Sequence, residues 1–262
     1  YSARYSFFKK PPLQNHPPRG VAEQFATIES LLPGRLDLGI GRAPGTDPVT
    51  ARALRRNAEG LNGDSFPREL TALIGFFRGA DPDGIVASPG RDAEPQVWLL
   101  GSSGYSAQVA AVLGLPFAFA HHIAPDNTAA ALALYRDNFR PSETLSAPYT
   151  IVAASAICAD TDAEADRLAA PRDLAFAQLR AGRPQALATP EQAAAFPGSD
   201  AERRFAAQRK AGQLQGSPDT VRAQAAELLA AAAPDELMLN TLVYDIDARI
   251  RSLELTRAAL DG

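Results

Sequence analysis

The chain of 262 residues contains one cysteine, one methionine, one tryptophan and three histidines. Its single cysteine, Cys158, cannot form an internal disulfide, and its apolar, strand-like surroundings predict a buried structural thiol rather than a nucleophile. Three histidines and one cysteine offer few ligands for a dedicated zinc site, so we predict no metal site. The near absence of cysteine also fits a reducing compartment, and we expect a cytoplasmic location.

Long apolar runs and an excess of basic residues are also missing from the sequence. No apolar run reaches the roughly 18 residues that a membrane span requires, and no secretory signal precedes the first predicted helix. The formal charge of −4 and the lack of a basic run argue against nucleic acid as a partner. We therefore expect one globular α/β domain over residues 1–262, with neither a nucleic-acid nor a membrane partner.

Three motifs that are common among α/β enzymes are absent. Gly39-Ile40-Gly41 lacks the third glycine of a dinucleotide-binding loop, and no Gly-Lys-Ser/Thr follows a strand. Ser103 lies in Gly-Ser-Ser-Gly rather than in a nucleophile elbow of the form Gly-x-Ser-x-Gly. This disfavours hydrolase chemistry.

The periodicity of the chain predicts helices that alternate with short buried strands, which is typical of a parallel sheet wrapped by helices. The five strands are expected at residues 36–40, 97–100, 115–120, 149–159 and 235–240. Helical faces are expected in the segments between them, including a polar helix at residues 50–59. Residues 160–215 are expected to form a helical insertion whose pieces are broken at prolines, among them Pro171.

Arg42 follows the first predicted strand, in which apolar residues alternate with small or polar ones. Gly39 and Gly41 leave the backbone bare beside it, so a bulky ligand could approach closely. Because α/β folds bind ligands at the carboxyl ends of their strands, Arg42 is a candidate anion ligand. A surface arginine that merely follows a core strand is the alternative.

The second predicted strand ends in residues 101–106, Gly-Ser-Ser-Gly-Tyr-Ser, where a helix begins. Backbone N–H groups and hydroxyls at the positive end of a helix bind phosphate, although serines also cap helices for structural reasons. A guanidinium from the neighbouring strand could hold the same phosphate through two parallel hydrogen bonds. The predicted phosphate site comprises Arg42, Ser102, Ser103 and Ser106, with Gly101, Gly104 and Tyr105 as backbone contributors.

His121 and His122 end the third predicted strand. One of these rings could act as an acid or base or contact a cofactor; alternatively, one packs in the interior and the other lines a loop. Asn240 and Thr241, at the end of the last strand, could line the same opening or make ordinary loop contacts. We assign no catalytic residue.

Several segments together resemble the luciferase-like flavin-dependent monooxygenases, especially the bacterial luciferase-like oxidoreductases whose substrates are unassigned. They are Val-Ala-Glu-Gln-Phe at residues 21–25, Pro-Gly-Arg-Leu-Asp-Leu-Gly-Ile-Gly-Arg-Ala-Pro-Gly-Thr-Asp at residues 33–47, residues 101–106, Gly-Leu-Pro at residues 114–116 with His121-His122, and residues 235–245. The resemblance covers roughly residues 14–260.

This resemblance implies a (β/α)8 TIM-barrel-type fold that binds reduced flavin mononucleotide (FMN) or, less often, the deazaflavin F420. The family's phosphate-binding arginine corresponds to Arg42, and its other phosphate contacts correspond to Ser102, Ser103 and Ser106. The implied reaction is activation of O2 by the reduced flavin and oxygen insertion into a small aldehyde- or ketone-like substrate. A separate flavin reductase would then supply the reduced cofactor.

The chain departs from the family pattern at its N-terminal end, where we expect about three strand–helix units of the barrel to be missing. Five predicted strands stand in place of eight, so we expect an incomplete barrel, either a fragment or a truncated paralogue. Open sheet edges favour pairing with another chain, and a homo-oligomer is expected. The alternatives are a non-catalytic flavin-binding paralogue and an α/β domain that binds a phosphate ligand without a redox role.

Overall fold

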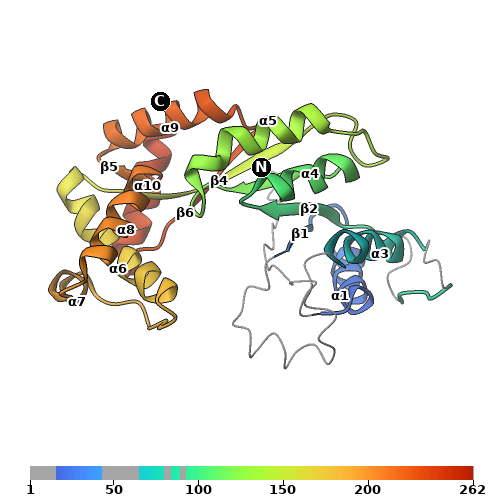
Figure 1. The fold of residues 1–262 in the computed structure, drawn as a ribbon, viewed down its shortest axis with the longest axis horizontal. Coiled ribbons are helices and arrows are strands. Elements are labelled where there is room, and N and C mark those ends of the chain that lie inside the picture. The colour runs from blue at the N-terminus through green and yellow to red at the C-terminus, as the bar shows by residue number, and fades with distance from the viewer. Residues whose placement is uncertain (1–15, 43–64, 80–83, 89–92, 262) are drawn as a thin grey trace. The chain divides into compact units, whose positions relative to one another are not determined.

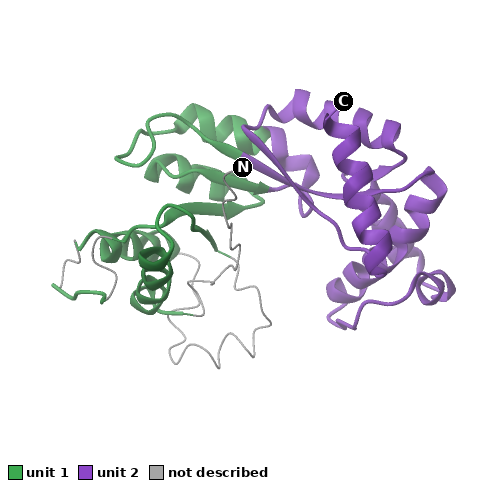
Figure 2. Cartoon of the chain, turned by 180° about the vertical axis from the view of Figure 1, so that it is seen from behind, with its two compact units in different colours: residues 1–119, 130–150 green, residues 120–129, 151–262 purple. Residues whose placement is uncertain are grey.

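The computed structural model describes residues 16–42, 65–79, 84–88 and 93–261. The chain divides into two compact units: unit 1, residues 1–119 and 130–150, and unit 2, residues 120–129 and 151–262 (Figure 2). The helix predicted at residues 50–59 lies outside the described residues. The single domain expected over residues 1–262 stays a prediction.

Three parallel strands form the sheet of unit 1 (Figure 1): β1 (Asp37–Gly41), β2 (Gln96–Gly101) and β3 (Phe117–Ala120). The central strand, β2, pairs Leu99 with Ile40 of β1 and with Phe117 of β3. All three side chains are fully buried, which agrees with the near-continuous apolar runs expected of a parallel sheet. These strands were predicted within one or two residues of their ends.

The helices of unit 1 begin and end where local chemistry favours it. Helix α1 (Pro18–Leu31) and helix α3 (Phe66–Arg78) each carry proline in the first turn, and α4 (Gly104–Leu113) follows β2. Gly79 and Gly114 end α3 and α4 in the left-handed conformation, with φ of 64° and 61°. Residues 130–138 of helix α5 (Thr128–Asn138) also belong to unit 1.

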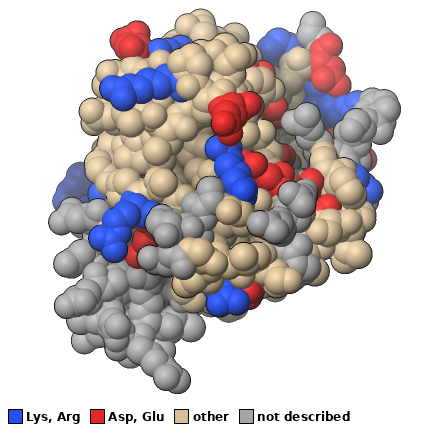
Figure 3. All heavy atoms as spheres, turned by 90° about the vertical axis from the view of Figure 1, so that its right-hand side faces the viewer, with Lys and Arg blue, Asp and Glu red and all other residues tan. Residues whose placement is uncertain are grey.

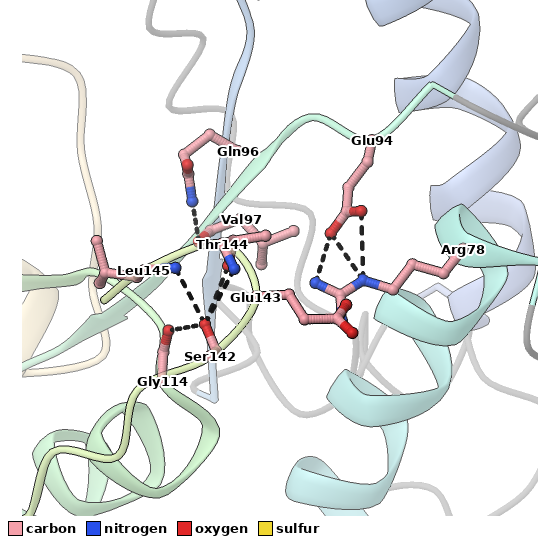
Figure 4. Close-up of polar contacts among 9 residues, drawn as sticks. All are labelled: Arg78, Glu94, Gln96, Val97, Gly114, Ser142, Glu143, Thr144 and Leu145. Atoms are coloured by element: carbon pink, nitrogen blue, oxygen red, sulfur yellow. Dashed lines mark hydrogen bonds and ion pairs between the residues drawn. The ribbon is translucent and has the colours of Figure 1, made fainter. Parts of the chain in front are cut away.

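A polar cluster lies beside the amino end of β2 (Figure 4). The Arg78 guanidinium lies 2.9 Å from the Glu94 carboxylate and 3.2 Å from the Glu143 carboxylate. The hydrogen bond to Glu94 raises the pKa of Arg78. Nearby, the Ser142 hydroxyl donates to the Gly114 carbonyl at 2.9 Å. The cluster ties α3 to the loops that precede β2 and follow α5, away from the carboxyl ends of the strands.

Unit 2 is organised around β4 (Thr150–Cys158), which pairs in parallel with two different strands. Its residues 151–155 pair with β6 (Glu236–Asn240), and its residues 156–158 pair with β5 (Leu214–Gly216). The two faces of β4 meet different helices. One face packs against α9 (Pro218–Ala232) and the other against α6 (Asp162–Arg180).

The predicted helical insertion is observed as α6, α7 (Pro190–Ala195) and α8 (Asp200–Ala211). The prediction that Pro171 breaks a helix is wrong, because α6 continues through it. Leu168 and Ala169 are buried beside it, and this packing offsets the one backbone hydrogen bond that proline removes. Helices α7 and α8 each start with a capping box, and no residue of α8 is fully buried.

Arg172, on α6, is a fully buried charge with only 1% of its surface exposed. Its guanidinium lies 2.8 Å from the Asp173 carboxylate and donates to Gln215 Oε1 at 2.7 Å and Ser155 Oγ at 3.4 Å. Burial raises the pKa of Asp173, although the charge of Arg172 opposes this. The pair is a structural anchor for α6 against β4 and β5.

Apolar periodicity predicts that Val112 of α4 and Leu229 of α9 face inward, and this prediction is wrong. The two residues are 44% and 39% exposed. Each helix instead buries alanines, Ala110 and Ala111 in α4 and Ala225 in α9, because small side chains allow a close approach to the sheet. Alanine is common on both faces of a helix, so apolar periodicity does not show which alanines pack against the sheet.

Helix α10 (Ile246–Asp261) buries Ser252, Thr256 and Ala259. None of the helices within the described ranges combines the length and the apolar character needed to cross a membrane. On the face drawn in Figure 3, acidic and basic side chains are interspersed among uncharged ones.

Candidate functional site

Arg42 and residues 101–106 follow the carboxyl ends of two adjacent parallel strands of unit 1. Arg42 comes directly after Gly41, the last residue of β1, and Gly101 is the last residue of β2. The guanidinium carbon of Arg42 lies 4.5 Å from the centre of the Tyr105 ring. The structure therefore brings Arg42 to the first turn of α4, as the pairing of the two strands predicts.

Helix α4 begins with a serine that does not cap it. Ser103 has the extended conformation of an N-cap residue, but its side chain accepts no hydrogen bond from the helix. Its hydroxyl instead lies 3.5 Å from the hydroxyl of the buried Ser106. The first-turn N–H groups of any α-helix have no partner within the helix, so here they are available to an anion together with the hydroxyls.

Gly101 is required where the strand turns into the helix. A Cβ atom at this position would lie 2.2 Å from Ser106 Cβ and 2.5 Å from Ser106 Oγ. The backbone of β2 thus passes directly against the first turn of α4, which only glycine permits. Gly104 is less restricted, since a Cβ there would lie 3.3 Å from Leu134 Cδ2.

Tyr105 contributes its side chain as well as its backbone. The sequence predicts only a backbone role for this residue, which is 38% exposed, and no spacing rule predicts that its ring lies beneath the Arg42 guanidinium. Such cation–π contacts contribute about 0.5–1 kcal/mol at exposed sites. The contact restricts the guanidinium to the vicinity of the helix start while leaving its N–H groups available.

The two histidines belong to unit 2 and are both held by hydrogen bonds. His121 Nδ1 lies 2.7 Å from Thr128 Oγ1, which itself donates to the Pro125 carbonyl. His122 Nδ1 donates to the Ala153 carbonyl at 2.8 Å, which leaves its Nε2 as the unprotonated nitrogen of the neutral ring. Burial lowers the pKa of both rings.

The other polar residues considered in unit 2 bond to nearby structure. Asn240 Nδ2 and Thr241 Oγ1 donate to the β4 carbonyls of Ala154 and Ala156, at 3.2 and 2.8 Å. These bonds agree with the alternative that Asn240 and Thr241 make ordinary structural contacts instead of lining a binding site. Cys158 is buried, and burial raises the pKa of its thiol, which fits a structural thiol.

Comparison with known proteins identifies related chains over almost the whole sequence. The family model for luciferase-like monooxygenases matches residues 11–236. A protein of Escherichia coli strain K12 named luciferase-like monooxygenase is 44% identical over 244 residues, which cover 93% of this chain and 72% of the relative.

Solved structures share the fold. The structure of apo-MsnO8 matches with a TM-score of 0.83 and 36% identity, over 96% of this chain and 76% of that one. The oxygenating constituent of 3,6-diketocamphane monooxygenase from Pseudomonas putida, a type II Baeyer–Villiger monooxygenase solved with FMN, matches with a TM-score of 0.61. It is 22% identical, over 94% of this chain and 76% of that one.

These matches confirm the predicted fold class, a TIM-barrel-type α/β fold. Six strands lie in the part of the chain that the structure describes, against the eight of a closed barrel. The matches also support an oxidoreductase of the monooxygenase kind. Because the family model spans most of the sequence and its named relative is 44% identical, the chain belongs to the luciferase-like monooxygenase family.

Proposed function

We propose that this protein uses reduced FMN and O2 to oxygenate a small aldehyde- or ketone-like substrate, and that the FMN phosphate binds between Arg42 and the start of α4. The observation that carries the proposal is the position of the Arg42 guanidinium, 4.5 Å from the Tyr105 ring centre in the first turn of that helix. A diketocamphane monooxygenase with the same fold is known in complex with FMN, which supports a flavin here.

The residues present fit a phosphate dianion. Arg42 offers two parallel N–H groups, and hydrogen bonds from an arginine to phosphate are among the strong ones in proteins. Ser102, Ser103 and Ser106 offer hydroxyls, and the positive end of the α4 dipole adds to the attraction. Gly101 lets the backbone approach the anion closely.

The chemistry of the bound cofactor is the transfer of electrons to O2. This chain's own residues would hold the phosphate, fix the position of the cofactor and limit the access of water. We assign no catalytic residue, since the described geometry places no acid or base beside the phosphate site. Electrons would come from NADH or NADPH through a flavin reductase, and we propose a homo-oligomer as the working form.

The test is a comparison of FMN with riboflavin, which lacks the phosphate. We expect Arg42→Ala to weaken FMN binding by about ten- to a hundredfold, because hydrogen bonds to charged groups contribute about 1.5–3 kcal/mol. Riboflavin binding should stay unchanged. Flavin fluorescence quenching measures both affinities on the same protein.

Arg19→Ala is the matched control, since Arg19 is an exposed arginine of unit 1 that pairs with Glu23 on α1. It should alter neither affinity. Equal losses for FMN and riboflavin in Arg42→Ala would contradict the phosphate assignment. F420 in place of FMN tests the cofactor choice, and tighter binding of F420 would overturn FMN as the cofactor.

Turnover distinguishes the oxygenase from the alternatives. With a flavin reductase, NADH and an aldehyde, we expect consumption of O2 and formation of the carboxylic acid. Bound yellow flavin without turnover would instead support a non-catalytic flavin-binding protein. Binding of phosphorylated sugars by a colourless protein would support a phosphate-binding domain without a redox role.

A further inference from the structure

Unit 2 contains a cavity of about 540 Å³ whose lining includes none of the residues of the predicted phosphate site. It lies between the segment 122–127 and helices α6 and α8. Its volume falls within the range of about 300–1,000 Å³ that is typical of small-molecule sites. The wall is formed mainly by His122, Ile123, Phe176, Leu179, Phe205, Arg209 and Gln213.

Arg209 of α8 lines this cavity and has an unsatisfied guanidinium edge. Its Nη1 donates to the His122 carbonyl at 3.3 Å, but Nε and Nη2 are buried and have no hydrogen-bond partner among the described residues. One face of the guanidinium lies on Phe176, with the guanidinium carbon 3.8 Å from the ring centre. The Nε–H and one Nη2–H point in parallel along one edge, which is the arrangement that accepts both oxygens of a carboxylate.

Gln213 provides a second unsatisfied group. Its side chain is 3% exposed, and neither its amide nitrogen nor its amide oxygen has a hydrogen-bond partner in the described chain. Buried polar groups are hydrogen-bonded in more than about nine cases in ten. Two neighbouring residues with four unpaired buried atoms between them indicate a missing ligand rather than a packing accident.

Much of the remaining wall is apolar. Ile123 and Leu179, two large aliphatic residues of this wall, are 60% and 58% exposed. The Phe176 and Phe205 rings add flat apolar surface. A ligand that covered these side chains would need an alkyl or aromatic body next to its charged group.

We propose that this cavity binds a small organic carboxylate. The carboxylate pairs with the Nε and Nη2 edge of Arg209, the Gln213 amide bonds a neighbouring polar group of the ligand, and the apolar body lies on Ile123, Leu179 and Phe176. Arg180 also lines the wall, with its guanidinium carbon 4.6 Å from the centre of the Phe205 ring, and Asp126 in the same wall opposes the charge that Arg180 adds. The paired edge of Arg209 therefore matches the one negative charge of a carboxylate.

The experiment compares hexanoate with the neutral hexanamide, which has nearly the same shape, by isothermal titration calorimetry on the full 262-residue chain without flavin. We expect hexanoate to bind at least tenfold more tightly. Arg209→Gln should remove this preference while leaving hexanamide binding within about twofold. Hexyl phosphate serves as the second anion, and we expect it to bind more weakly than hexanoate.

Arg204→Gln is the matched control, because Arg204 is an exposed arginine on the same helix. It should not change the hexanoate affinity. If Arg209→Gln does not fold, as judged by circular dichroism, Arg209→Lys and Gln213→Leu decide the question. Arg209→Lys keeps the charge but loses the paired edge, so both variants should weaken hexanoate several-fold.

Equal affinity for hexanoate and hexanamide, or no heat from hexanoate at millimolar concentration, would overturn the proposal. Tighter binding of hexyl phosphate would replace the carboxylate with a phosphate ester. None of these measurements depends on FMN, so failure here would leave the phosphate site at Arg42 untouched.

Discussion

Replacing the buried Arg172 by methionine should destabilise unit 2 strongly. Methionine replaces the aliphatic stem of arginine but has no guanidinium, so Arg172→Met removes the contact with Asp173 at 2.8 Å and the hydrogen bond to Gln215 at 2.7 Å. The Asp173 carboxylate, whose side chain is 16% exposed, then stays in a largely dry site without the guanidinium that contacts it, and Arg209 remains as a more distant positive charge. The free energy of unfolding should fall for both reasons.

The magnitude follows from these contacts. Breaking a buried ion pair from one side costs about 3–5 kcal/mol, and the partial exposure of Asp173 places this case near the lower limit. We therefore expect a loss of about 3 kcal/mol for Arg172→Met. Asp173→Asn in the same chain removes the stranded charge, so the double variant should recover about 1–2 kcal/mol relative to the sum of the single changes.

The effect should also depend on pH. Burial raises the pKa of Asp173 in the folded protein, and the charge of Arg172 counteracts part of that rise. A carboxyl group with a raised folded pKa contributes stability below its unfolded pKa, and this contribution is lost as the pH rises through the folded pKa. Because Arg172→Met raises the pKa of Asp173 further, the loss of stability should be smaller near pH 5 than near pH 8.

Urea unfolding of the wild type, both single variants and the double variant, followed by circular dichroism, measures this cycle at each pH. Additive effects, within about 0.5 kcal/mol, would refute the reasoning, because they would show that the two side chains are not coupled. A loss below about 1 kcal/mol for Arg172→Met would do the same, since it would mean that the carboxylate is already well solvated.

Two further predictions concern the other features of the fold. Gly101→Ala would place a Cβ 2.2 Å from Ser106 Cβ, so we expect about 1–3 kcal/mol of destabilisation in thermal or urea unfolding. Gly20→Ala, whose Cβ would lie 3.7 Å from Pro17, is the control and should be neutral or slightly stabilising. The pKa of His122 is lowered mainly by burial, so NMR titration should give a midpoint below the ordinary value of 6.5. The stability of the folded protein should decline as the pH falls through this midpoint. A midpoint at or above 6.5 would show that the ring is more solvated than its surroundings indicate.

The strands could be predicted where apolar residues run continuously, or alternate with small or polar ones, over at least four residues. The segments at residues 36–40, 97–100 and 235–240 match β1, β2 and β6 closely. Strand β5 was missed because Leu214–Gly216 is only three residues long and is defined by its pairing with β4 rather than by any pattern of its own. The continuation of α6 through Pro171 depends on burial of its neighbours, which a local rule for proline does not include.

The candidate site could be predicted in outline, because parallel strands place their carboxyl ends at one edge. That rule alone predicts that Arg42 and the turn at Gly101 lie close together. The contact with the Tyr105 ring depends on side-chain direction, which spacing does not determine. Arg209 and Gln213 had no sequence signal at all: their importance lies in hydrogen bonds that are not made, and these become visible only once the surroundings are known.

The capping boxes of α7 and α8 have an evolutionary consequence. Thr189 with Gln192, and Ser199 with Glu202, encode the start of each helix within four residues, while α8 itself contributes no fully buried side chain. Substitutions elsewhere along these helices therefore change the lining of neighbouring cavities without moving the point at which either helix begins. In such a segment, evolution can change the ligand preference one residue at a time while both helices keep their starting points.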